Sequence, residues 1–172
     1  RLVLGLPDEA LAMNWLAGQI RGGDLRLLLR LAHGAPLRAL GLADPTLMAR
    51  RDTAFAGFVD VGQGRRDPVA EAQTWGDLGP RISLEWLGGW VSDLLRLAAV
   101  GVSAGAVDGA AYLGNPDKRQ PLSLLAERLN PEEGHRYLQR ILRSRASQDT
   151  PLNPQLLHEA LLIDWAHVAR KV

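Results

Sequence analysis

Apolar residues recur along the chain at intervals of three and four positions, the spacing that lines one face of an α-helix. In the range 7–20 this face comprises Met13, Leu16, Ala17 and Ile20, and in the range 154–170 it comprises Leu157, Leu161, Trp165 and Val168. No stretch alternates apolar and polar residues in a way that predicts a β-strand. The pattern therefore predicts an all-α protein.

Four of the predicted helices begin at the same pair of residue types, an Asp or Asn followed by a proline. The Asp or Asn side chain can accept hydrogen bonds from the free amides of the first turn. Proline suits the first helical position because an amide there would have no partner within the helix. The pairs are Asp44-Pro45, Asp67-Pro68, Asn130-Pro131 and Asn153-Pro154.

The first 43 residues have the pattern of three short helices. Gly22-Gly23 ends the first helix, and Asp24 can cap the second. Gly34 is expected to end that second helix, and Pro36 to open a third that reaches about Leu42.

The pattern of residues 44–172 predicts a second, larger domain. Residues 100–121 are rich in Gly, Asn and Pro, which indicates a long loop with at most one helical turn. We therefore expect a three-helix domain over residues 1–43 and a bundle of five or six helices over residues 44–172.

The helix expected over residues 83–100 carries more apolar surface than one core requires. One stripe comprises Leu84, Leu87, Val91 and Leu94, and its flank carries Trp86, Trp90 and Leu97. An apolar face about 100° wide is enough to contact a core. The flank therefore either packs against another helix of the bundle or contacts a partner protein, since tryptophan is enriched at interface hot spots.

Composition narrows the chemistry. The chain has 172 residues, a net charge of +1 and no cysteine, which excludes disulfides, thiolate metal sites and cysteine nucleophiles. No apolar run approaches the roughly 20 residues of a membrane span, and the first ten residues lack the pattern of a signal peptide. We expect a cytoplasmic protein without membrane contact. Because the chain starts at Arg1 rather than at a methionine, we expect a fragment of a longer protein.

Candidate catalytic and metal-binding residues do not form a recognisable motif. The histidines, His33, His135, His158 and His167, are expected at the surface or at helix ends, and "HEALL" lacks the second histidine of a zinc-protease helix. Gly62 and Gly64 have no preceding strand and no following Gly-Lys-Ser/Thr, so they do not predict a phosphate loop. Ser83 and Ser92 have no nucleophile-elbow context. We expect no catalytic residue, metal or cofactor.

A basic stripe lies on the helix that follows Asn130. Arg136, Arg140 and Arg143 recur at helical spacing, with Arg145 close by. Such a stripe can bind nucleic-acid phosphates. It can equally be a solvated or protein-contacting face with pairs such as Glu132 and Arg136. The near-zero net charge favours the second alternative.

The order and spacing of four segments resemble those of clamp-loader subunits of the AAA+ family, and among them the delta-prime subunits of bacterial DNA polymerase III. These segments are "RLVLGLPDEALAMNWL", "LLRLAHGAPLRAL", "LEWLGGWVSDLLRL" and "LNPQLLHEALLIDW". The resemblance implies that residues 1–43 are the AAA+ lid and residues 44–172 the collar domain that joins loader subunits. It implies a component of the polymerase III holoenzyme. The implied partners are the gamma/tau and delta subunits and, through the complex, the sliding clamp and primed DNA.

The turn Gly34-Ala35-Pro36-Leu37-Arg38 resembles the sensor-2 turn of ATP-hydrolysing relatives. In those relatives an arginine occupies the fourth position of the turn, where this chain has Leu37. One residue along a helix rotates a side chain by about 100°, so Arg38 is expected to point away from a nucleotide and into solvent. The resemblance therefore implies a subunit that does not hydrolyse ATP. The alternatives are the corresponding region of the gamma/tau subunit and a helical nucleic-acid-binding module.

Overall fold

The computed structural model describes residues 5–100, 113–146 and 153–170, and in these ranges it contains helices, turns and no strand. The predicted all-α class is confirmed. The α-helices are α1 (Glu9–Gln19), α2 (Leu25–Leu31), α3 (Pro36–Leu42), α4 (Pro45–Gly62), α5 (Pro68–Thr74), α6 (Gly79–Val100), α7 (Arg119–Ala126), α8 (Pro131–Ala146) and α9 (Pro154–Arg170), with 3-10 turns at Gly76–Leu78 and Pro116–Lys118.

The four helix starts predicted from Asp-Pro and Asn-Pro pairs are confirmed. Each proline is the first residue of its helix, α4, α5, α8 or α9. The preceding side chain accepts from a backbone amide in each case, as Asp44 does from Thr46 at 2.9 Å and Asn153 from Gln155 at 3.0 Å. These bonds satisfy amides that the helix itself leaves unpaired.

The prediction of a loop over residues 100–121 is wrong at the C-terminal end of that range. Helix α7 begins at Arg119 and includes Pro121 as its third residue. A proline in the first helical turn removes an amide that would have no partner in the helix, so it does not stop the helix from starting there. Residues 101–112 of the expected loop lie outside the described residues.

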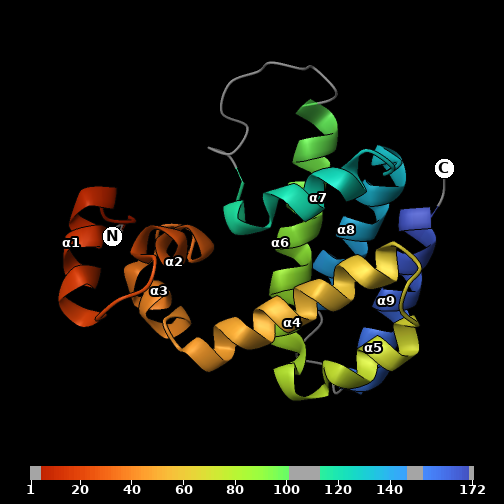
Figure 1. Cartoon of the computed structure of the whole chain (residues 1–172), viewed down its shortest axis with the longest axis horizontal. Helices are drawn as coiled ribbons and strands as arrows, with labels where there is room; N and C mark the ends of the chain where they lie inside the picture. Colours follow the sequence, from red (N-terminus) through yellow and green to blue (C-terminus); the bar gives the residue numbers. More distant parts are fainter. Residues whose placement is uncertain (1–4, 101–112, 147–152, 171–172) are drawn as a thin grey trace.

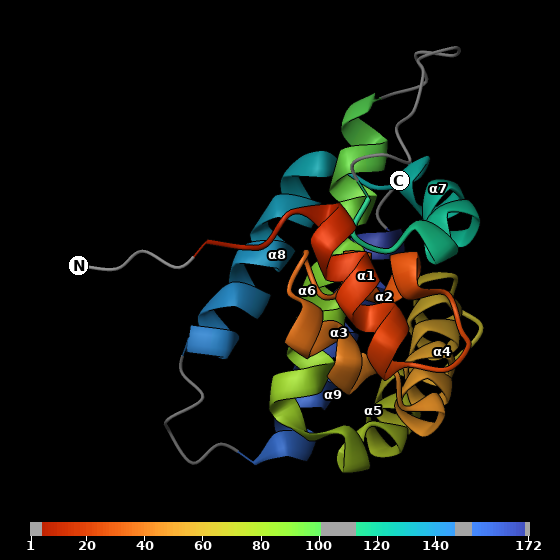
Figure 2. The ribbon, with the colours of Figure 1, turned by 90° about the vertical axis from the view of Figure 1, so that its left-hand side faces the viewer.

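The buried apolar residues form two clusters. The smaller one, within α1–α3, comprises Ala12, Leu16, Leu28, Leu29, Ala32 and Ala39. The larger one extends over α4–α9 and contains Phe58, Trp75, Trp90 and Trp165. Figure 1 shows α1–α3 at one end of the molecule, and Figure 2, seen from that end, shows them in front of the bundle.

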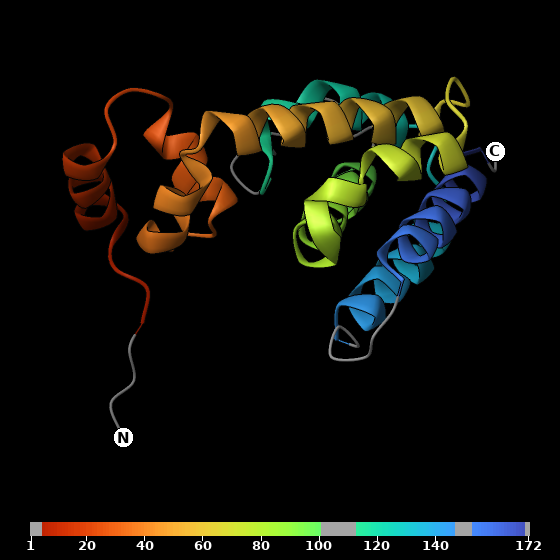
Figure 3. The same cartoon turned by 90° about the horizontal axis from the view of Figure 1, so that it is seen from below.

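Helix α4 connects the two parts and runs along the bundle (Figure 3). Its residue Phe58 stacks on Trp165 of α9 with ring centroids 4.3 Å apart, and its carbonyl accepts from the indole N–H at 2.8 Å. Helix α6 is the central element, because α7, α8 and α9 all pack against it. The long apolar helix thus forms the centre of the bundle.

Candidate functional site

The turn between α2 and α3 is a Schellman-type helix end. The Gly34 amide donates to the Leu29 carbonyl and the His33 amide to the Arg30 carbonyl, both at 2.9 Å. His33 has φ 53° and Gly34 has φ 82°, so the first left-handed residue after the helix is the histidine. The helix consequently ends at Leu31 rather than at Gly34.

The sequence predicts that Arg38 points into solvent. In the structure its side chain is half-buried instead. Its guanidinium Nη2 donates to Oε1 of Glu85 on α6, so the pair joins the three-helix part to the bundle. Burial lowers the pKa of Arg38, and the nearby charges of Arg145 and Arg81 lower it further. Leu37, at the sensor position, is 75% exposed.

A groove of about 170 Å³ lies where α6 and α8 meet the three-helix part. Its walls include Leu31, Leu42, Leu84, Trp86, Leu142 and Arg145. His33 lines the groove too, and its pKa is lowered by partial burial and by the charges of Arg38 and Arg96. The groove therefore has mixed walls, because the charged residues Glu85, Asp93 and Arg96 line it together with the apolar ones.

A second, larger cavity of about 360 Å³ lies on the other side of His33. Leu29 and Arg30 of α2 line it together with Arg96 of α6 and Leu113. Arg96 and His33 line both cavities, so polar side chains separate them.

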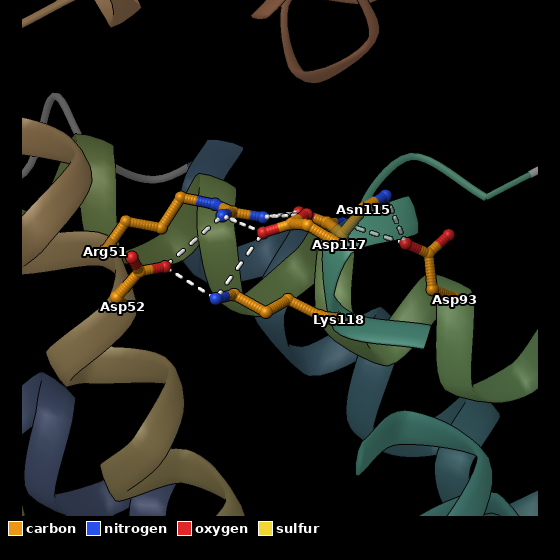
Figure 4. Close-up of polar contacts among 6 residues, drawn as sticks. All are labelled: Arg51, Asp52, Asp93, Asn115, Asp117 and Lys118. Carbon is orange, nitrogen blue, oxygen red and sulfur yellow. Dashed lines mark hydrogen bonds and ion pairs between the residues drawn. The ribbon is translucent and has the colours of Figure 1, made fainter. Parts of the chain in front are cut away.

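Arg51 of α4 is 1% exposed and is the centre of a polar network beneath this junction (Figure 4). Its Nη1 donates to Asp117 at 2.8 Å, and its Nη2 donates to the Asn115 side-chain oxygen at 2.7 Å. Burial alone would raise the pKa of Asp117, but the hydrogen bond and charge of Arg51, with those of Lys118, lower it. Lys118 also lies 2.5 Å from Asp52. The network therefore connects α4 to the segment before α7.

The buried carboxylate of Asp93 extends this network to α6. It accepts from the backbone amide and the side-chain amide of Asn115, both at 2.8 Å, and from the Gly114 amide at 3.0 Å. Arg96 donates to it at 2.7 Å. A buried carboxylate requires such bonds to remain charged, so Asp93 holds residues 114–115 against α6.

Trp86 and Trp90, considered as partner-contacting residues, lie in the core of the bundle. Trp90 is 0% and Trp86 7% exposed, while Leu97 is partly buried against the same cluster. The Trp90 ring lies 5.2 Å from the Phe55 ring and 5.4 Å from the Phe58 ring, measured between centroids. Their burial favours the within-bundle alternative that the sequence left open.

Two of the four arginines of the basic stripe on α8 form ion pairs. Arg136 pairs with Glu132, as predicted, and also with Glu133. Arg140 pairs with Asp164 of α9. The stripe therefore has the character of a solvated, salt-bridged face.

No sequence pattern indicates the buried polar cluster that lies between α5, α6 and α9. His158 is 1% exposed, so the expectation of a surface or helix-end histidine is wrong for this residue. Its Nε2 lies 2.6 Å from the Ser83 hydroxyl. Glu71, also 1% exposed, pairs with Arg66 and accepts from the Trp75 indole at 2.8 Å.

Among the described residues, no group of three or more His, Asp or Glu side chains is arranged to hold a metal ion. The helices in those ranges include none that is both long and apolar enough to span a membrane.

The described residues define an all-α protein whose helices are joined to one another by polar networks. A family model described as "DNA polymerase III, delta subunit, C terminal" matches residues 45–167, well over half of the chain. The chain therefore belongs to this family of DNA polymerase III clamp-loader subunits, as the resemblance predicted at the level of the complex. No curated protein matches the chain.

Proposed function

We propose that the chain is the lid and collar of a delta-prime-type clamp-loader subunit that has no catalytic residue or cofactor. Its collar would help hold the pentameric loader together by contacting the gamma/tau and delta subunits. It would act in the cytoplasm on the sliding clamp and primed DNA only through that complex. The loader role is supported most strongly by the family match over residues 45–167, and the delta-prime type by the resemblance of the four segments.

The division into a lid (1–43) and a collar (44–172) is part of this proposal. It is supported by the separation of the buried apolar residues into a cluster in α1–α3 and another in α4–α9. The family match also begins at Pro45, the first residue of α4.

The proposed absence of ATP hydrolysis rests on the turn Gly34-Ala35-Pro36-Leu37-Arg38. Leu37, which replaces the sensor arginine of hydrolysing relatives, cannot neutralise a phosphate. Arg38 is paired with Glu85 and so is engaged with the bundle. This disfavours the gamma/tau alternative.

Ion pairs within the chain also disfavour the alternative of a nucleic-acid-binding module. Arg136 and Arg140 of the basic stripe are paired with carboxylates, and binding DNA phosphates would require those pairs to break. The net charge of +1 adds no general attraction to DNA.

Reconstitution with purified loader subunits tests the proposal. One mixture contains gamma/tau and delta and lacks delta-prime; the other contains gamma/tau and delta-prime and lacks delta. We expect the chain to co-elute with the first mixture in size-exclusion chromatography. If the chain co-elutes only with the mixture that lacks delta, it is a delta-type subunit. If it co-elutes with neither mixture, the loader role is refuted. Calorimetry with ATP should show no tight binding.

A further inference from the structure

Three arginines and one glutamate come together where the three-helix part meets the bundle. Arg81 and Glu85 are four residues apart on α6 and therefore lie on the same face of that helix. Arg38 of α3 reaches Glu85 from the other side. Arg145, near the end of α8, lines the same groove as Glu85. We call Arg38, Arg81, Glu85 and Arg145 the arginine cluster.

The charges of the arginine cluster do not balance. Glu85 is paired with Arg38, whereas Arg81 and Arg145 have no carboxylate partner in the part of the chain that the structure describes. Their charges disfavour the charged form of Arg38, the usual effect of neighbouring like charges. An additional carboxylate at this position would relieve that repulsion.

A groove with both apolar and charged walls lies beside the arginine cluster. Arg145 and Leu142 are three residues apart on α8, so both side chains project from the same face. Leu142 is 50% exposed and lines the 170 Å³ groove with Leu84 and Trp86. The surface thus offers apolar side chains in a groove next to unpaired positive charge.

We propose that the arginine cluster and this groove are a docking site for an acidic segment of a partner protein. Carboxylates of the segment would pair with Arg81 and Arg145, since guanidinium groups bind carboxylates through two parallel hydrogen bonds. An apolar side chain of the segment would occupy the groove. A protein segment fits better than a nucleic acid, because an apolar side chain of the segment can contact Leu84 and Leu142 in the groove. The inference rests on the proposed function for the existence of a partner in the loader.

Charge reversal in the reconstituted complex tests the docking site. In the variants Arg81→Glu and Arg145→Glu the new carboxylate repels the acidic segment, and each variant should weaken assembly with the gamma/tau and delta subunits by about tenfold or more. The matched control is Arg143→Glu, an exposed α8 residue whose hydrogen bond, at 3.4 Å, goes to Gln139. This control should bind within about twofold of the unmodified chain, because rim charges away from a contact contribute little. Thermal melts check that all three variants remain folded.

The possible outcomes separate the two proposals. If the unmodified chain assembles and both charge reversals bind as the control does, the docking site is refuted and the loader role stands. If the unmodified chain does not assemble, both proposals fall. A titration with a labelled single-stranded 20-mer of DNA adds another arm. If the two variants lose DNA binding but assemble normally, the ligand of this site is a nucleic acid and the acidic segment is refuted.

Discussion

The imidazole Nε2 of His158 lies 2.6 Å from the hydroxyl oxygen of Ser83 in the core between α9 and α6. The hydroxyl also lies 3.1 Å from the Gly79 carbonyl, to which it can donate. We infer that the ring donates from Nε2 to Ser83 and that its Nδ1 carries no proton. That Nδ1 has no hydrogen-bond partner among the described residues, so a second ring proton would be buried without an acceptor.

This geometry predicts a loss of stability in mild acid. Burial lowers the pKa of His158 from 6.5, so the unfolded chain takes up a proton at a higher pH than the folded chain does. Stability is therefore full above pH 6.5 and falls as the pH drops toward the folded-state pKa, by up to about 1.4 kcal/mol per pH unit. Urea unfolding at several pH values between neutrality and mild acid measures the slope.

Two variants separate His158 from the other histidines. In His158→Asn the slope should decrease, leaving a part due to His33, whose pKa is also lowered. The exposed residue His135 provides the control, and His135→Asn should retain the slope of the unmodified chain. An unchanged slope in His158→Asn would contradict the prediction.

The network around Arg51 predicts a large energetic effect of a single substitution. Arg51→Met removes the buried cation and leaves the Asn115 side-chain oxygen without its donor, while Asp117 keeps only Lys118 as a cationic partner (Figure 4). Leaving the buried Asn115 oxygen without a donor costs about 1–3 kcal/mol. Chemical denaturation should show this loss, whereas the exposed neighbour variant Arg50→Met should change stability by less than about 0.5 kcal/mol. Equal effects in the two variants would argue against the network.

Trp90 provides a direct test of the core assignment of α6. Its ring is 0% exposed and is surrounded by other aromatic rings, so Trp90→Ala should cost roughly 3–5 kcal/mol of stability. Leu124→Ala is the control, because that side chain is 54% exposed and its removal leaves no cavity. A small loss of stability in Trp90→Ala, combined with weaker assembly, would instead support a partner contact.

The helix starts could be predicted from the sequence because capping is local. Asp44 and Asn153 accept from amides two residues ahead, so a short stretch of sequence contains both donor and acceptor. The Arg38–Glu85 pair joins residues 47 positions apart, and the His158–Ser83 contact joins residues 75 apart. Helical periodicity specifies which residues share a face, but not which other helix that face contacts.

The surplus apolar surface of α6 illustrates the same limit. A helix that packs on one side needs only a narrow apolar stripe. Trp86 and Trp90 lie beside that stripe, so the sequence alone allows them to contact a partner. In the structure, helices from distant parts of the chain surround α6. The stripe that contains Leu84 and the flank that carries Trp86 and Trp90 are therefore both buried. The number of neighbours depends on tertiary packing, which single-helix patterns do not contain.

The last prediction concerns the independence of the two parts of the chain. The cluster in α1–α3 contains six buried apolar residues, whereas the bundle has a much larger core with several aromatic rings. Domains of about 40 residues rarely fold without further support. Part of the support here is the Arg38–Glu85 pair, which a cut before Asp44 removes. Residues 44–172 alone should therefore remain helical and unfold cooperatively, and residues 1–43 alone should be largely unfolded. Circular dichroism of both pieces measures this, and a cooperative melt of the 43-residue piece would contradict it.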